Sequence, residues 1–487
     1  MSRKKVFFTA IIWRAVQSMG QQGISFVITL VLARLLCPDD FGVFAIVNFF
    51  IAISLVFSEG GIGMALVYKE DLDQIDLETA LTFNLAIALI FFLLLFFLSP
   101  FLADFYGKPM LSPMLRVIGV QIIISSCTVV QYAQLNREMR FRALSISALT
   151  ASSVAGCIGI IMALCGMGTW SLVIQHLCSA TLLAAIYWLA VPWLPRFRFN
   201  RGRFKKLFSW GGGVLLSRLI ANMSRDCYAM IIGKVYSISD AGLINRAQAL
   251  EYMPRNNGIA VFCDVASPAA FRCQNDDTQL RKIIGRFLRT TYFVLLPVLC
   301  WMLVYAETII EVLMGAKWCA AAPLLRILCL AGMFMIQNDF VNLAFKAKNR
   351  IRQLVAVEFF RRVFFITTAC ATCWVGLSAL LWGGVAVWGI IFLVNAWFAG
   401  RLIDFGLRRQ LLDSAPVFLL NLFTAAILWT TGGYLRRLPP VGAMIASLLL
   451  TFVIYMGTAL LFRMKDVTEA WSMVREKFFK PAAAEDA

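Results

Sequence analysis

Long apolar runs separated by short polar connections recur along the whole chain. Each run is about 20 residues long, which is the length of a helix that crosses a hydrocarbon core about 30 Å thick. The pattern therefore predicts about fourteen transmembrane helices. The predicted spans are residues 9–35, 42–66, 79–101, 114–135, 143–165, 169–192, 207–234, 241–265, 288–312, 322–345, 354–377, 381–403, 415–435 and 441–463.

Composition supports the same class of protein. The chain has 487 residues, of which 60% are hydrophobic and 15% are charged, and its mean hydropathy is +0.78. An average soluble domain is about half apolar and about a quarter charged. We therefore expect an all-α polytopic membrane protein. The first span follows MSRKK and holds Arg14, Gln17 and Gln21 without a small-residue cleavage site, so we expect it to stay in the mature protein.

Basic residues predict the orientation of the spans, because cytoplasmic loops keep Lys and Arg. The loops after even-numbered spans, together with the terminal segments, hold roughly 30 of the 45 basic residues. Both termini are therefore predicted to be cytoplasmic. The loop at 68–78, YKEDLDQIDLE, is acidic instead. We interpret it as a solvated connector, since acidic residues contribute little to topology.

The remaining composition argues against several kinds of site. The net charge of +18 is spread over loops next to the membrane, which favours anionic lipid headgroups over nucleic acid as its partner. The 13 cysteines have no repeated ligand spacing, and His176 is the only histidine, so we expect no metal and no cofactor. The chain has neither a nucleotide-binding glycine loop nor a GxSxG motif. A transporter is therefore favoured over an enzyme.

The two halves of the chain resemble each other. ARLLCPDDFGVF aligns with GKVYSISDAGLI, so that Asp40 matches Asp240 and Gly42 matches Gly242. PMLR and PLLR follow later in the same order. Repeated bundles are common in transporters, so we expect two parallel six-helix lobes around a central cleft plus two C-terminal helices. We interpret the two aspartates as helix caps. The predicted parts are an N-terminal lobe at 1–192, a basic cytoplasmic linker at 193–206, a C-terminal lobe at 207–404, helices 13 and 14 at 405–463 and a cytoplasmic tail at 464–487.

Charged residues concentrate in the first, seventh and eighth spans, at a depth where ionisable groups are costly and commonly face a cavity. Arg218, Asn222 and Arg225 share one helix face, because they are spaced at i, i+4 and i+7. Arginines outnumber acids in these spans; the arginines are Arg14, Arg218, Arg225, Arg246 and Arg255, and the acids are Asp226, Glu251 and Asp264. The surplus predicts an anion-binding cleft, since guanidinium groups bind phosphate oxygens bidentately. The alternative is that the arginines only pair with these acids and reach towards headgroups.

Four stretches resemble a known family. They are RLLCPDDFGVFAIVNFFIAISLVFSEGGIGMALV, NREMRFRALSISALTASSVAG, GMGTWSLVIQHL and SDAGLINRAQAL. These stretches are similar to polysaccharide transporters of the multidrug/oligosaccharidyl-lipid/polysaccharide (MOP) exporter superfamily. The branch resembles the Wzx type of flippase, close to the colanic-acid exporter group. The resemblance covers roughly residues 1–400.

The resemblance implies a fourteen-helix flippase in the bacterial inner membrane. Such proteins move undecaprenyl-diphosphate-linked polysaccharide repeat units from the cytoplasmic to the periplasmic leaflet by alternating access, for exopolysaccharide, O-antigen or capsule biosynthesis. A polysaccharide polymerase and a chain-length regulator would be partners. The five arginines would bind the diphosphate, and the sugars would meet Gln21, Asn245, Tyr252 and Asn256. Coupling to protons or sodium would involve Asp226, Glu251 and Asp264.

Other activities stay open from the residues alone. A flippase for the peptidoglycan precursor would use the same cationic cleft, although the motifs favour the Wzx type. A drug or cation antiporter of the same superfamily would need surplus acid in its cavity, which is the reverse of the observed count. A membrane scaffold without transport activity would leave the repeat and the polar helix faces unexplained.

Overall fold

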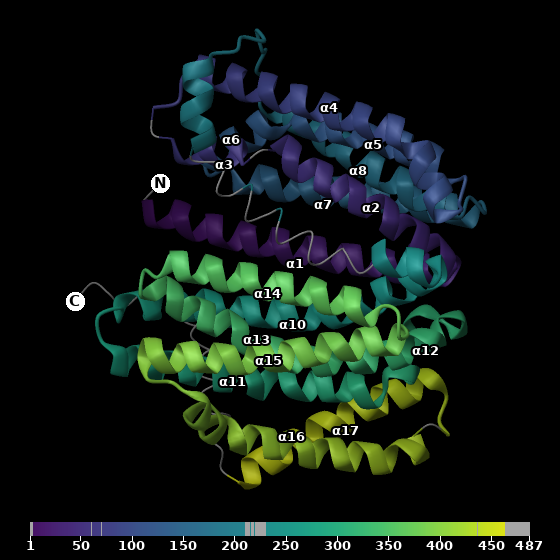
Figure 1. Ribbon diagram of the computed structural model, residues 1–487, viewed down its shortest axis with the longest axis vertical. Coiled ribbons are helices and arrows are strands. Elements are labelled where there is room, and N and C mark those ends of the chain that lie inside the picture. The colour runs from purple at the N-terminus through teal and green to yellow at the C-terminus, as the bar shows by residue number, and fades with distance from the viewer. Residues whose placement is uncertain are drawn as a thin grey trace. The chain divides into compact units, whose positions relative to one another are not determined.

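The structure is a computed structural model. It describes residues 3–59, 61–69, 71–209, 230–435 and 437–462, together with Leu215 and Leu219. All regular secondary structure in this part of the chain is helical (Figure 1). The chain divides into two units, Met1–Gly242 and Leu243–Ala487. The predicted division into two six-helix lobes stays a prediction.

The first unit is built from long helices that pack side by side. The helices are α1 (Arg3–Leu35), α2 (Pro38–Glu59), α3 (Ile62–Tyr68), α4 (Gln74–Tyr106), α5 (Leu111–Ser126), α6 (Val129–Arg137), α7 (Phe141–Leu164) and α8 (Thr169–Ala190). Extensive packing joins α4 to α5, and α7 to both α1 and α8. A further short helix covers residues 201–209, within the region predicted as the basic linker and the start of the seventh span.

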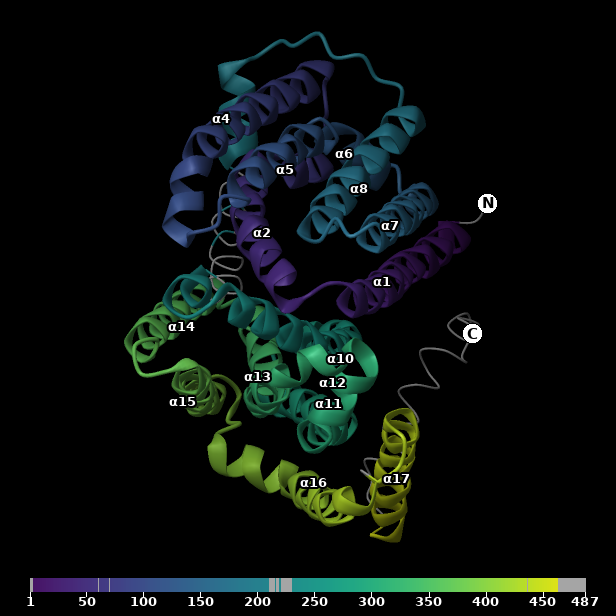
Figure 2. The same ribbon diagram turned by 90° about the vertical axis from the view of Figure 1, so that its right-hand side faces the viewer.

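In the second unit, α13 lies at the centre of a helical bundle (Figure 2). The helices are α10 (Ile238–Arg272, whose first turn belongs to the first unit), α11 (Asp277–Val304), α12 (Ala306–Met314), the 3-10 helix η1 (Ala316–Ala321), α13 (Ala322–Ala347), α14 (Ile351–Thr372), α15 (Leu377–Ile403), α16 (Leu407–Leu435) and α17 (Pro440–Leu461). Helix α13 packs against α11, α12, α14 and α15, while α16 packs on α11 and α17. Side chains of α13 therefore lie in the interior of this unit.

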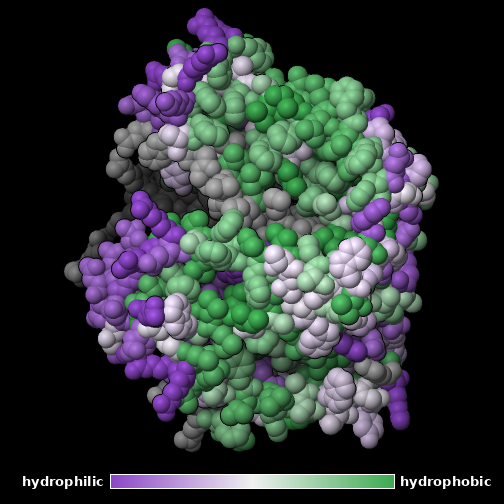
Figure 3. Space-filling model, viewed as in Figure 1, coloured by the Kyte–Doolittle hydropathy of each residue, from purple (hydrophilic) through white to green (hydrophobic). Residues whose placement is uncertain are grey.

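The described residues contain 10 helices that are long and apolar enough to cross a membrane. Hydrophobic side chains cover the middle of the helices on the face drawn in Figure 3, and hydrophilic ones gather towards the helix ends. The prediction of a multi-pass, all-α membrane protein is confirmed. Helices α10 and α14 are long enough to span but are not apolar enough to be counted. Most of the predicted seventh span, 207–234, lies outside the described residues, so the number fourteen stays a prediction.

The duplicated motifs form equivalent helix starts. Asp40 lies in the first turn of α2 and accepts a hydrogen bond from the backbone N–H of Cys37 at 3.0 Å. Asp240 lies in the first turn of α10, where its N–H donates to Ser237 Oγ at 3.0 Å. Both aspartates therefore belong to helix caps, because these bonds satisfy groups that have no partner within the helix.

Gly42 and Gly242, the matched glycines, lie in close backbone contact inside the first unit. A Cβ on Gly42 would overlap the carbonyl oxygen of Ile238, and a Cβ on Gly242 would overlap that of Pro38. Pro38 and Ile238 are themselves matched by the repeat. The contact is thus reciprocal, and it requires glycine at both positions because no side chain fits between the two helix starts.

Candidate functional site

Helix α10 carries a buried ion pair at membrane depth. Glu251 and Arg255 lie one turn apart, at i and i+4, so their side chains meet on one helix face. Arg255 donates to both carboxylate oxygens of Glu251, through Nε to Oε1 and through Nη2 to Oε2 at 3.3 Å. Each side chain is 7% exposed. The pair is therefore enclosed by protein, where an unpaired charge would be strongly unfavourable.

Gly332 of α13 makes room for this pair. A Cβ at position 332 would overlap Glu251 Oε1 and would lie 3.4 Å from Arg255 Cδ. The glycine lets the backbone of α13 approach the carboxylate directly. Two turns further along α13, Asp339 is partly buried and lies within electrostatic range of Arg255, Arg361 and Lys346.

Helix α14 carries a second charged group near the middle of its length. Glu358, Arg361 and Arg362 are spaced at i, i+3 and i+4, and both arginines face the same carboxylate. Arg361 forms an ion pair with Glu358, and Arg362 Nη2 lies 3.6 Å from Glu358 Oε2. The centre of the Trp388 ring lies 5.5 Å from the Arg361 guanidinium carbon.

Asparagines of α13 and α15 complete the second charged group. Asn338 Oδ1 accepts hydrogen bonds from Arg361 and, at 3.1 Å, from Asn395 Nδ2. Asn342 Nδ2 donates to Glu358 Oε1 at 3.0 Å. Three helices therefore hold the side chains of Glu358 and Arg361 in one orientation.

The opposite face of α14 explains the inward position of these charges. Phe359, Phe360 and Val363 are 49%, 69% and 42% exposed on the surface of the unit. Apolar side chains thus face outward, where lipid would surround the helix, and the charged face turns towards α13 and α15. This arrangement follows from the high free energy of a charge in contact with hydrocarbon.

We call this set of side chains the polar core. It consists of Glu251, Arg255, Asn338, Asp339, Asn342, Glu358, Arg361, Arg362 and Asn395. The set holds three arginines and three carboxylates, and Lys346 of α13 is a further cation within electrostatic range of Asp339. The sequence prediction counted surplus arginine on three other spans and did not include α14. Glu358, Arg361 and Arg362 were nevertheless detectable, since they are charged residues inside the predicted apolar span 354–377.

The structure brings together only some of the predicted site residues. Glu251 and Arg255 form the buried pair, and the Tyr252 ring lies 5.6 Å from the Arg255 guanidinium carbon. Arg246 donates to Asn245, its neighbour, through Nε at 3.2 Å. Asn256 is partly buried, and Asp264 is exposed further along α10.

The other predicted residues lie in the first unit or outside the described part of the chain. Gln21 is exposed on α1. Arg218, Arg225 and Asp226 lie outside the described residues, as does the side chain of Arg14. Their proposed roles in binding and ion coupling stay predictions.

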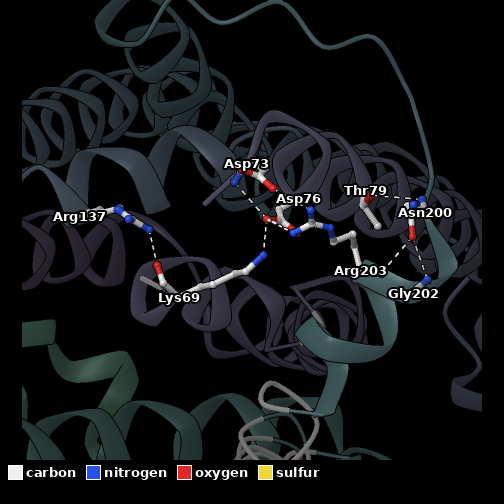
Figure 4. A network of polar contacts seen from close by, with 8 residues as sticks. All are labelled: Lys69, Asp73, Asp76, Thr79, Arg137, Asn200, Gly202 and Arg203. Atoms are coloured by element: carbon white, nitrogen blue, oxygen red, sulfur yellow. Dashed lines mark hydrogen bonds and ion pairs between the residues drawn. The ribbon is translucent and has the colours of Figure 1, made fainter. Parts of the chain in front are cut away.

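A different group of charges occupies the first unit, where the acidic loop meets the basic linker (Figure 4). Asp76 is fully buried, and Lys69 and Arg203 converge on its carboxylate, with Arg203 Nη1 at 3.6 Å. Arg203 Nη2 also lies 2.8 Å from Asp73 Oδ2. We call Lys69, Asp73, Asp76 and Arg203 the linker clasp. The interpretation of the acidic loop as a solvated connector is therefore wrong for Asp76, which is fully buried, whereas Asp73 is 54% exposed although it also pairs with the linker.

A family model described as polysaccharide biosynthesis protein matches residues 31–323. The chain belongs to this family. The succinoglycan biosynthesis transport protein ExoT of Rhizobium meliloti is 26% identical over 66% of this chain and 65% of its own length, so the match spans less than two thirds of ExoT. The lipopolysaccharide biosynthesis protein WzxC of Escherichia coli is 20% identical over 75% of this chain and 75% of its own length.

A solved structure of the lipid II flippase MurJ, in an inward closed conformation, shares the fold. It covers 93% of this chain and 99% of the MurJ chain, with a TM-score of 0.74 and 13% sequence identity. The expected polysaccharide biosynthesis family is confirmed, and the expected Wzx type of flippase agrees with the similarity to WzxC and with the MurJ-like fold. Within this polysaccharide biosynthesis protein, the family match includes Glu251 and Arg255, whereas the polar-core residues of α13, α14 and α15 lie beyond residue 323.

Proposed function

We propose that this polysaccharide biosynthesis protein is a flippase. It carries an undecaprenyl-diphosphate-linked oligosaccharide from the cytoplasmic to the periplasmic leaflet of the bacterial inner membrane by alternating access. The observation that carries the proposal is the polar core, which places three arginines at membrane depth inside the second unit. Charged groups within membrane helices commonly mark the path of a substrate or an ion. The polysaccharide relatives support the substrate class.

The chemistry of arginine supports a diphosphate headgroup. A guanidinium group presents paired donors that match two phosphate oxygens, and it stays charged at any physiological pH. Arg246 and Arg255 are the proposed headgroup ligands on α10, with Arg14, Arg218 and Arg225 as further ligands. Since Glu251 already holds Arg255, a diphosphate at this position would have to replace that carboxylate. Gln21, Asn245, Tyr252 and Asn256 are the proposed sugar contacts.

The direction of transport follows from charge. An anionic headgroup that moves outward across an inside-negative membrane releases about 2.3 kcal/mol per charge per 100 mV. Asp226, Glu251 and Asp264 are the proposed sites for any further coupling to an ion. The proposal places both termini in the cytoplasm, and it includes a polysaccharide polymerase and a chain-length regulator as partners.

Polymer export in a host strain lacking its own exporter tests the proposal. Arg246→Ala and Arg255→Ala are compared with the wild type at matched membrane levels. We expect export to fall about tenfold or more, because each change removes an interaction of roughly 1.5–3 kcal/mol with a charged group. Arg326→Ala is the matched control, since its pair with Glu307 at 2.9 Å is partly exposed and lies outside the polar core.

Two results would contradict the proposal. Normal export by both α10 variants would remove the arginines from the substrate path. Rescue of a strain depleted of its peptidoglycan-precursor flippase, without any polymer export, would assign the chain to that other substrate.

A further inference from the structure

Both carboxylate oxygens of Glu358 have partners from other side chains. Oε1 accepts from Asn342 at 3.0 Å, while Oε2 pairs with Arg361 and lies 3.6 Å from Arg362. One negative charge thus stands between two guanidinium groups. An anion that approaches these arginines has to compete with Glu358 for their N–H donors.

The group on α14 is more accessible than the pair on α10. The side chains of Glu358 and Arg362 are 21% and 25% exposed, whereas those of Glu251 and Arg255 are each 7% exposed. A ligand can therefore reach Arg362 without unfolding the bundle. Arg361, at 10% exposed, pairs with the same carboxylate and is fixed by Asn338.

The number of negative charges on a ligand determines whether it can replace the Glu358 carboxylate at Arg361 and Arg362. A phosphodiester lipid with one negative charge would exchange one anion for another and leave Glu358 without its two arginines in a low-dielectric interior, which is unfavourable. A diphosphate offers a second charge and a second set of oxygens, so it engages both arginines at once. The exchange is then favourable for the diphosphate and unfavourable for the phosphodiester.

We propose that Glu358 is an internal counter-ion that makes Arg361 and Arg362 selective for a diphosphate over phospholipids with one charge. This inference rests on the proposed function, and it adds α14 to the residues that recognise the substrate. Selectivity matters because the cytoplasmic leaflet is rich in anionic lipids. Two arginines without a counter-ion would be occupied by those lipids.

Lipid binding to the purified full-length protein in detergent tests the inference. The probes are undecaprenyl diphosphate and phosphatidylglycerol, and native mass spectrometry gives the affinity for each. For Glu358→Gln we expect affinity for phosphatidylglycerol to rise about tenfold, with a smaller change for the diphosphate, so that the ratio of the two affinities falls. Glu358→Asp keeps the charge and is expected to keep the selectivity. Glu307→Gln, the same charge change at the partly exposed pair with Arg326, is expected to leave the ratio unchanged.

A second variant covers the case in which Glu358→Gln does not fold. In Arg362→Gln the remaining arginine is matched by Glu358, so we expect affinity for the diphosphate to fall about tenfold while that for phosphatidylglycerol stays the same. Equal changes for both lipids in either variant would overturn the inference. A wild type that binds phosphatidylglycerol and no undecaprenyl diphosphate would overturn the proposed function itself, which separates the two failures.

Discussion

The linker clasp and the polar core both contain buried carboxylates, but their cations differ in position: those of the clasp lie near helix ends, and those of the core lie near the middle of long helices. In the clasp, Lys69 and Arg203 are 25% and 36% exposed around a fully buried Asp76. In the polar core, Arg255 is only 7% exposed and sits deep within α10 rather than at a helix end, while Arg362 is 25% exposed near the middle of α14. A cation near a helix end keeps part of its hydration, whereas one at membrane depth depends on its protein partners.

The two groups also differ in what they join. The clasp connects the start of α4 to the linker, which lies far away in the sequence, and Asn200 N–H adds a bond to Thr79 Oγ1 at 3.2 Å. Such contacts fix the path of the chain. The polar core joins helices of the second unit that also pack against one another elsewhere along their length, α13 with α15 above all. We therefore expect the clasp to contribute to stability and, under the proposed function, the core to contribute to substrate binding.

The largest expected effect is the loss of Glu251. Glu251→Ala leaves the Arg255 guanidinium buried without its carboxylate, which is expected to destabilise the fold by about 3–5 kcal/mol. Thermal unfolding of the purified protein in detergent measures the change. The double variant Glu251→Ala, Arg255→Met should recover much of that stability, because it removes the unpaired charge. Wild-type stability in Glu251→Ala would show that Arg255 has another way to satisfy its charge.

A smaller effect is expected from Gly332→Ala. The added Cβ overlaps Glu251 Oε1, so the ion pair or α13 has to shift, at a free energy of about 1–3 kcal/mol. Gly389→Ala on α15 is the matched control, since nothing lies within 4 Å of its Cβ position. The unfolding temperature and the amount of exported polymer should both fall in Gly332→Ala and stay unchanged in the control. Equal behaviour of the two variants would refute the close approach of α13.

Asp76→Asn sharpens the comparison between the two groups. The amide keeps the shape of the side chain but loses the charge that holds Lys69 and Arg203, so we expect a loss of about 1–2 kcal/mol in stability. Polymer export per folded molecule should stay near the wild-type level, because the clasp is structural. A loss of export as large as that of Arg255→Ala, at equal protein levels, would remove the distinction.

The smallest effect is expected at an exposed pair. Arg326→Gln breaks the bond to Glu307, whose side chain is 49% exposed, and exposed ion pairs contribute only about 0–1 kcal/mol. Unfolding temperature and export should both stay close to the wild type. A shift as large as that of Glu251→Ala would mean that burial does not govern the strength of ion pairs in this protein.

Sequence reasoning found the charged residues of α10 but not those of α14. Arg246, Glu251 and Arg255 stood out because several polar residues follow one another in one span. Glu358, Arg361 and Arg362 occur in a span that is otherwise apolar, so the same rule applied to span 354–377 would have identified them. Their partners Asn338 and Asn395 were beyond this reasoning, since no local pattern indicates which helices are neighbours.

The sequence by itself determined the class of protein, the approximate positions of most helices and the family. The helix positions could be predicted because a chain that crosses the hydrocarbon core has to form apolar helices of a fixed length, and this requirement is visible in the local sequence. Only the tertiary structure decided which charges meet. Asp76 pairs with Arg203 of the linker, and Glu358 is held by Asn342 of another helix. Hydropathy reports the depth of a residue along its helix, whereas the pairing of charges depends on which helices pack together and on their rotation.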